Sequence, residues 1–142
     1  MIPSGKCISV IGTLTFSADD DVLIHVDGVS RGWTNDAWYS THTEVVTSAC
    51  VIAIILYNNA DNGGFIASTS SGMVTDASWK CNNYVETGWT TCGFDDAHWP
   101  DAVVVGDYNV NDPTYAAINA NAKWISLYRT AGVAYCRKRI CP

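Results

Sequence analysis

The segment TDASWKCNNYVETGWTTCGFDDAHWP, residues Thr75–Pro100, contains three of the six tryptophans of the chain and two of its six cysteines. It has almost no run of alternating apolar residues, so side chains have to hold a backbone that lacks a long ladder of strand hydrogen bonds. Because bulky aromatic residues dominate protein cores, we expect Trp79, Trp89 and Trp99 to close one end of a β-sandwich. The alternative is that a ring stays at the surface and stacks on a ligand. Trp89, which follows a glycine in a polar run, fits either reading.

Length and composition indicate a single all-β domain spanning residues 1–142. Charged residues make up only 15% of the chain, and Glu44 and Glu86 are its only glutamates. Gly, Ser, Thr, Asn and Asp are plentiful, which is typical of a turn-rich β protein and not of a helical one. We therefore expect an antiparallel β-sandwich.

Alternating apolar and polar residues predict the strands. The predicted strand segments are residues 8–16, 22–27, 43–47, 65–70 and 102–105. The nearly continuous apolar run 50–57 predicts a central strand that is buried on both faces. Asp27-Gly28 is a strong hairpin signal, and residues 123–129 and 133–137 are expected to form a closing hairpin. The long polar loop 106–122 is of the kind that often carries function.

Several classes of function are disfavoured. The net charge of −6 repels phosphates, so nucleic acids and anionic membranes are not expected partners, and the basic run 137–139 is expected to be a solvated chain end. The longest apolar run, 51–57, has the length of a strand and not of a membrane span. The usual catalytic signatures are missing from the sequence. Adjacent Asp95 and Asp96 normally point apart, and we expect one of them to cap a turn that seats Trp99; the chain is not expected to be an enzyme.

The cysteines indicate disulfides in an oxidising compartment, and hence a secreted protein. Their number is even, no CxxC motif occurs, and the three histidines are scattered, which disfavours a zinc site. The cysteines expected to pair are Cys7, Cys50, Cys81, Cys92, Cys136 and Cys141. Their spacing does not select a connectivity.

Two groups of residues are candidate ligand sites. The adjacent carboxylates Asp19, Asp20 and Asp21 form either a solvated turn or part of a calcium site. The loop 31–39 and the loop 58–64 are candidates for a sugar site, because flat rings beside amide and carboxylate groups suit the C–H face and the hydroxyls of a sugar. The predicted sugar-binding residues are Trp33, Asn35, Asp36, Trp38, Tyr39, Asp61 and Asn62. The alternative is that the aromatic residues of the first loop fold inward.

A family resemblance runs from about Thr13 to Arg137. The motifs are FSADDDVLIHVDG, TDASWKC, GW, FDDAHWP, KWI and YCRK. Together they resemble the galactose-binding-domain-like modules found as accessory domains of rhamnosidases and β-galactosidases and in related extracellular proteins. ADDDVLIHVDG alone also resembles the opening of PA14 modules.

The resemblance to galactose-binding-domain-like modules implies a jelly-roll-like antiparallel β-sandwich that binds ligands at loop ends, often with a structural calcium. Sugar-contact residues vary among these modules, so none is carried over. The positions of Cys81 and Cys136 in the motifs imply a disulfide between them, with Cys81–Cys92 as the competing local pairing. Function resides in sites that differ between proteins of one fold, so the resemblance alone does not assign it.

Two functions therefore remain as hypotheses. The first is an extracellular, non-catalytic carbohydrate-binding module or small lectin that needs no cofactor beyond a structural calcium. The second is a structural or adhesive extracellular module that self-associates or binds another protein.

Overall fold

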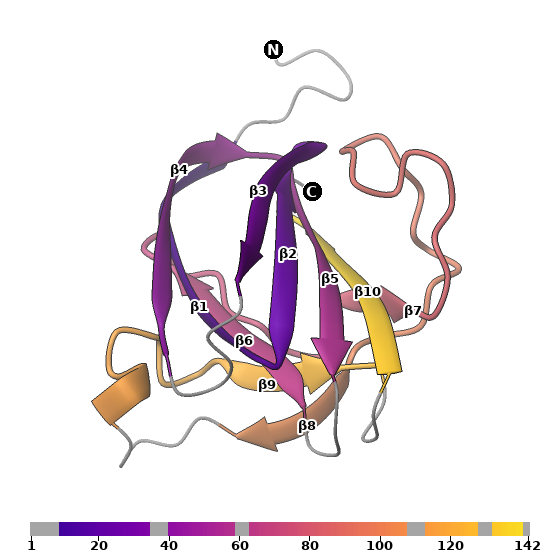
Figure 1. The fold of residues 1–142 in the computed structure, drawn as a ribbon. Helices are drawn as coiled ribbons and strands as arrows, with labels where there is room; N and C mark the ends of the chain where they lie inside the picture. The colour runs from indigo at the N-terminus through magenta and orange to yellow at the C-terminus, as the bar shows by residue number, and fades with distance from the viewer. Residues whose placement is uncertain (1–8, 35–39, 59–62, 108–112, 128–131, 141–142) are drawn as a thin grey trace.

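Two five-stranded antiparallel sheets pack face to face in a jelly-roll-like β-sandwich (Figure 1). The computed structural model describes residues 9–34, 40–58, 63–107, 113–127 and 132–140. The first sheet, sheet A, has the order β4 (His42–Ala49), β1 (Ser9–Asp19), β6 (Gly64–Thr69), β9 (Lys123–Ser126), β8 (Val103–Asp107). The second, sheet B, has the order β3 (Val29–Thr34), β2 (Asp21–Val26), β5 (Val51–Asn58), β10 (Gly132–Arg139), β7 (Lys80–Asn82). A short 3₁₀ helix, η2 (Pro113–Tyr115), follows β8. The predicted all-β sandwich is confirmed.

The core between the sheets follows the period of two that the sequence shows. On β2, Val22, Ile24 and Val26 are buried, and the residues between them are partly exposed. The inward residues of β1, β5 and β6 meet them in one cluster, which includes Trp79. Within the described part of the chain, no helix is long and apolar enough to cross a membrane.

The Asp27-Gly28 turn joins β2 to β3 as predicted. Val26 pairs with Val29, and both turn residues have positive φ, 50° for Asp27 and 84° for Gly28, as a type I′ hairpin requires. The Asp27 carboxylate also accepts hydrogen bonds from the backbone N–H groups of Cys50 (2.9 Å) and Val51 (3.0 Å). The turn is thereby tied to the start of β5.

Strand β5 is the central strand of sheet B and is buried on both faces, as its apolar sequence predicted. Ile52, Ile54 and Leu56 face the sandwich core. Ala53 points to the outer face, where it is fully buried under Trp89 and Trp99. The cover comes from residues 83–100, the long segment between β7 and β8.

The closing hairpin predicted for residues 123–129 and 133–137 is wrong. Strand β9 pairs with β6 and β8 in sheet A, and β10 pairs with β5 and β7 in sheet B. Alternation specifies which face of a strand is buried but does not specify its partner. Here the chain crosses from one sheet to the other between the two strands.

Two disulfides lie within the described residues, and no described cysteine is free. Cys81 and Cys136 are register partners on β7 and β10, which confirms the pairing implied by the family resemblance. The alternative Cys81–Cys92 pairing is wrong, because Cys92 pairs with Cys50 and attaches the segment 83–100 to the start of β5. Cys7 and Cys141 lie outside the described residues.

Candidate ligand-binding face

The segment 83–100 packs on the outer face of sheet B, beside β10 and β7 (Figure 1). Trp89 and Trp99 are 8% and 2% exposed and stack on each other with ring centroids 6.0 Å apart. The edge of the Trp89 ring contacts Tyr135, at 5.7 Å between centroids. The tryptophans are buried as expected, but these two cover the face of a sheet, whereas we predicted that they would close an end of the sandwich. Trp89 is therefore not a surface ring that could stack on a ligand.

Arg137 anchors this segment, although we expected the run 137–139 to be a solvated chain end. Its side chain is fully buried, because position 137 points to the outer face beneath the segment. The guanidinium donates to the carbonyl oxygens of Trp89 (2.9 Å) and Thr91 (2.8 Å) and forms an ion pair with Asp96. It also lies over the ring of Phe94, 5.2 Å from the centroid. Burial lowers the pKa of Arg137, and the charge of Asp96 opposes that shift.

The turn that carries Trp99 is held by two further carboxylates. Asp95 accepts a hydrogen bond from the N–H of Ala97 (3.0 Å), which confirms the predicted cap. Glu86 accepts from the indole N–H of Trp99 (2.9 Å) and contacts the Nε2 atom of His98 (2.6 Å). The hydrogen bond with His98, followed by that with Trp99, lowers the pKa of Glu86. Asp95 and Glu86 therefore both hold the turn that carries Trp99.

Beside the covered part, a row of large side chains crosses the outer face of sheet B. Trp33 on β3, Leu23 on β2, Ile55 on β5 and Tyr135 on β10 are successive register partners. The chain neighbours of Leu23, Ile55 and Tyr135 point into the sandwich core, so these three side chains point outward. Trp33 shares their face because it is the register partner of Leu23. Tyr57 follows Ile55 by two residues on β5, so its side chain is on the same face. We call Trp33, Leu23, Ile55, Tyr135 and Tyr57 together the aromatic face.

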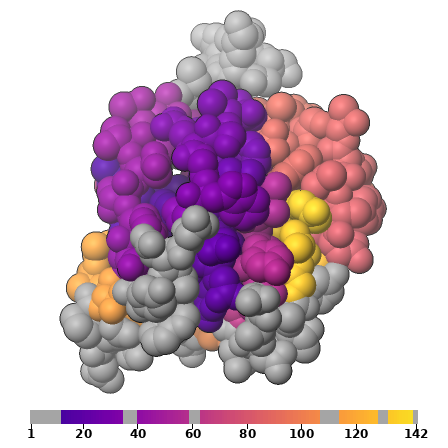
Figure 2. Space-filling view, in the orientation of Figure 1, coloured from indigo at the N-terminus to yellow at the C-terminus, as the bar shows by residue number. Residues whose placement is uncertain are grey.

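The aromatic face is partly open to solvent. Trp33 is 51% exposed and Tyr57 is 43% exposed, whereas Leu23, Ile55 and Tyr135 are partly buried. Strands in a sheet lie about 4.8 Å apart, so the strands of Trp33 and Tyr57 are separated by roughly 10 Å. In Figure 2, β2, β5 and β10 reach the surface side by side, next to the segment 83–100. The exposed rings therefore stand far enough apart to contact an elongated ligand.

The structure places only part of the predicted sugar site. Trp33 is exposed, as a stacking residue has to be. The other six predicted residues, Asn35, Asp36, Trp38, Tyr39, Asp61 and Asn62, lie outside the described residues. Sequence reasoning missed Tyr57 and Tyr135. Alternation in 51–57 places Tyr57 on the same face as Ile55, but only strand order shows that Trp33 shares this face.

The three adjacent aspartates are divided between the sheets. Asp19 ends β1 in sheet A, and Asp21 begins β2 in sheet B. Burial, then a hydrogen bond and repulsion from Asp20, raises the pKa of Asp19 to about 6. Among the described residues, no group of three or more His, Cys, Asp or Glu side chains is arranged to hold a metal ion. Calcium binding by Asp19, Asp20 and Asp21 stays a prediction.

The aromatic face offers non-covalent recognition. It presents flat rings and aliphatic side chains, and Asp21 lies next to Tyr57 as a hydrogen-bond acceptor at its margin. Searches with protein-family models, among curated proteins and among solved structures gave no match for this chain.

Proposed function

We propose that this protein is a non-catalytic carbohydrate-binding module, a small lectin, that holds a neutral glycan on the aromatic face. The observation that carries the proposal is the pair of exposed rings, Trp33 and Tyr57, on the outer face of sheet B. The C–H face of a pyranose stacks on such rings, and its hydroxyls need hydrogen-bonding groups at the margin. Asp21 is one such group, and the predicted residues Asn35 and Asp36 directly follow β3 in the chain.

The packing beside the aromatic face supports this function. Ile55 and Tyr135 pack against the buried Trp89–Trp99 cluster, and the Arg137 network and the Cys50–Cys92 disulfide hold that cluster on the sheet. A surface fixed in this way loses little conformational entropy when a ligand binds. The disulfides also fit a protein of an oxidising, extracellular setting, in agreement with the resemblance to galactose-binding-domain-like modules.

The expected affinity is weak for a single site. Two half-exposed rings and a few hydrogen bonds give dissociation constants on the order of micromolar to millimolar. Useful retention on a polysaccharide would then require several contacts at once, through repeated copies or several sites per copy.

The test is binding to a glycan array, followed by calorimetry with the best ligand for wild type, Trp33→Ala and Tyr57→Ala. Each variant truncates a half-exposed ring outside the sandwich core, so we expect the fold to be retained and the affinity to fall by about tenfold or more. The matched control is Val45→Ala, which removes a 66% exposed side chain from β4 in sheet A and should bind as wild type does. Glycan binding that survives both ring substitutions would refute this site.

The adhesive alternative predicts a different result from the same variants. The exposed Trp33 and Val29 lie on β3, an edge strand of sheet B, and edge strands can pair with other chains. If wild type self-associates in sedimentation experiments, binds no glycan, and becomes monomeric with Trp33→Ala, the adhesive function is correct and the lectin function is not.

A further inference from the structure

The outer face of sheet A is covered only in part. The side chain of Ile66 on β6 points outward and is fully buried under Tyr115, Ile118 and Ala122, which follow the start of η2. The edge of the Tyr115 ring packs on Trp124, with centroids 5.5 Å apart. This segment, residues 113–122, borders β1, where Thr15 is buried and Thr13 is partly exposed.

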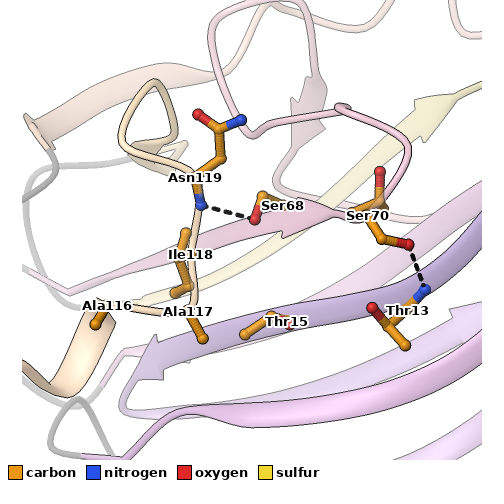
Figure 3. A pocket seen from close by; sticks show the side chains of 9 residues that line it. Thr13, Thr15, Ser68, Ser70, Ala116, Ala117, Ile118 and Asn119 are labelled. Atoms are coloured by element: carbon orange, nitrogen blue, oxygen red, sulfur yellow. Dashed lines mark hydrogen bonds between the residues drawn. The ribbon is translucent and has the colours of Figure 1, made fainter.

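A hollow of about 300 Å³ lies between the end of this cover and β1. Figure 3 shows the loop residues Ala116, Ala117 and Ile118 on one side and Thr13 and Thr15 of β1 on the other. The remaining lining residues are Ser68 and Thr69 of β6, Ser70 and Asn119. The hollow is small for a ligand pocket and matches a single sugar residue better than a large cofactor.

The lining is polar but uncharged. Six of its nine residues carry a hydroxyl or an amide, and the other three are Ala116, Ala117 and Ile118. The Ser68 hydroxyl accepts a hydrogen bond from the N–H of Asn119 (2.9 Å), and its own proton can still be donated. The Thr15 hydroxyl faces that of Thr43 at 3.4 Å, too long for a strong hydrogen bond. These groups can exchange hydrogen bonds with a ligand in both directions.

This lining selects a ligand class. A phosphate or carboxylate would lose its hydration without meeting a positive charge, which is costly. A flat base would find no aromatic ring among the lining residues on which to stack. A neutral monosaccharide offers donors and acceptors to the hydroxyls and an apolar C–H side to the alanines.

We infer that the hollow between β1 and residues 116–119 is a second sugar site, which binds one neutral monosaccharide residue. It lies on the outer face of sheet A, and the aromatic face lies on the outer face of sheet B. One copy of the protein therefore carries two sites that face in opposite directions, and it can cross-link glycans without forming a dimer. The cross-linking step rests on the proposed function of the aromatic face, whereas monosaccharide binding in the hollow does not.

The first experiment follows backbone amide shifts in NMR spectra of ¹⁵N-labelled protein during titration with the methyl glycosides of glucose, galactose and mannose. At least one should shift the amides of Thr15, Ser68 and Asn119, with a dissociation constant on the order of millimolar. Methyl glucuronide, which carries a carboxylate in place of the hydroxymethyl group of methyl glucoside, should bind more weakly. Shifts confined to other residues, or no shifts at all, would overturn the assignment.

Two variants connect these shifts to the hollow. Ala117→Trp places a large side chain at an exposed lining position and should abolish the titration, whereas Ala120→Trp, in the same loop but outside the lining, should leave it unchanged. Thr15→Val keeps the shape of the side chain but removes its hydroxyl and should weaken binding several-fold. Thr47→Val, an exposed position on β4, is its control. Equal binding by the blocked and the control variants would refute the hollow as the site.

The second experiment separates the two sites. Wild-type monomer should precipitate a neutral polysaccharide that it binds. The Ala117→Trp variant and the double variant Trp33→Ala/Tyr57→Ala should each fail to precipitate it. The double variant should still show the amide shifts that monosaccharides cause at the residues of the hollow. Shifts in the hollow without glycan binding at the aromatic face would refute the proposed function alone, and glycan binding without those shifts would refute the second site alone.

Discussion

Replacing the buried Arg137 with methionine should detach the aromatic segment from sheet B. Methionine fills a similar volume but leaves the carbonyls of Trp89 and Thr91 without their donors and Asp96 without its counter-ion. Charge-assisted hydrogen bonds contribute about 1.5–3 kcal/mol each, and breaking a buried ion pair costs about 3–5 kcal/mol. Asp96 retains 22% exposure, so water will solvate part of the stranded carboxylate. We expect Arg137→Met to lower the free energy of unfolding by about 4 kcal/mol.

The assay is urea unfolding followed by tryptophan fluorescence, with near-ultraviolet circular dichroism as a local probe of the stacked Trp89–Trp99 pair. Arg139→Met is the matched control, because Arg139 is exposed on the same strand and its loss should change stability by less than about 0.5 kcal/mol. In an Asp96→Asn background, Arg137→Met should cost about 1–2 kcal/mol less, since no charge is left unpaired. A loss below about 1 kcal/mol, or no difference between the two backgrounds, would refute the anchoring role.

Three other variants test separate parts of the fold. Replacing both Cys81 and Cys136 with alanine removes a disulfide with a sequence separation of 55 residues. It should lower the free energy of unfolding, measured in urea, by about 4 kcal/mol, and a variant as stable as wild type would contradict this. Asp27→Ala removes two hydrogen bonds to the start of β5 and should cost about 1–3 kcal/mol by the same measurement; an unchanged midpoint would contradict this. The pKa of Asp19 rises from 3.8 to about 6 on folding, so the folded state binds the proton more tightly and this carboxyl destabilises the protein above that value. The melting temperature of wild type should therefore rise relative to Asp19→Asn as the pH falls from 7 towards 4, and parallel curves would exclude the effect. If the aspartates bind calcium, millimolar calcium should raise the wild-type melting temperature above its value in chelator, and an equal response of Asp19→Asn would remove the hypothesis.

Much of the fold could be predicted from local patterns. The period of two on β2, the Asp27-Gly28 turn and the continuous apolar run of β5 each reflect a constraint that acts within a few residues. Strand partnership depends on contacts between distant segments, so the pairing of β9 and β10 could not be obtained from their alternation. The same limit concealed the burial of Arg137, because only the arrangement of strands shows that residues 83–100 cover its position.

The candidate sites also combine features that are local in sequence with features that depend on distant strands. Trp33 was identified because the predicted loop 31–39 combines aromatic rings with amide and carboxylate side chains. It lies on β3 and not in a loop, but it is exposed, as a stacking residue has to be. Its neighbours Tyr57 and Tyr135 come from β5 and β10, which are distant in sequence, and the hollow joins β1 and β6 to the residues that follow η2. A site assembled from several strands has no sequence motif, even where every strand in it is predictable.

The two long connections explain why the outer faces carry both a buried and an open strip. When the outer face of a sheet carries large side chains, those side chains are either covered by another segment or exposed to solvent. In each sheet of this protein, one part of the outer face is covered and another part is exposed. Residues 83–100 bury Ala53 and Arg137 and end their cover at Tyr135. Residues 113–122 bury Ile66 and border the hollow that Thr15 lines. Each open strip therefore borders a fixed loop that shapes one side of it. Because both loops are fixed by buried side chains, neither strip has to rearrange to present its surface, which lowers the entropic cost of a contact made there.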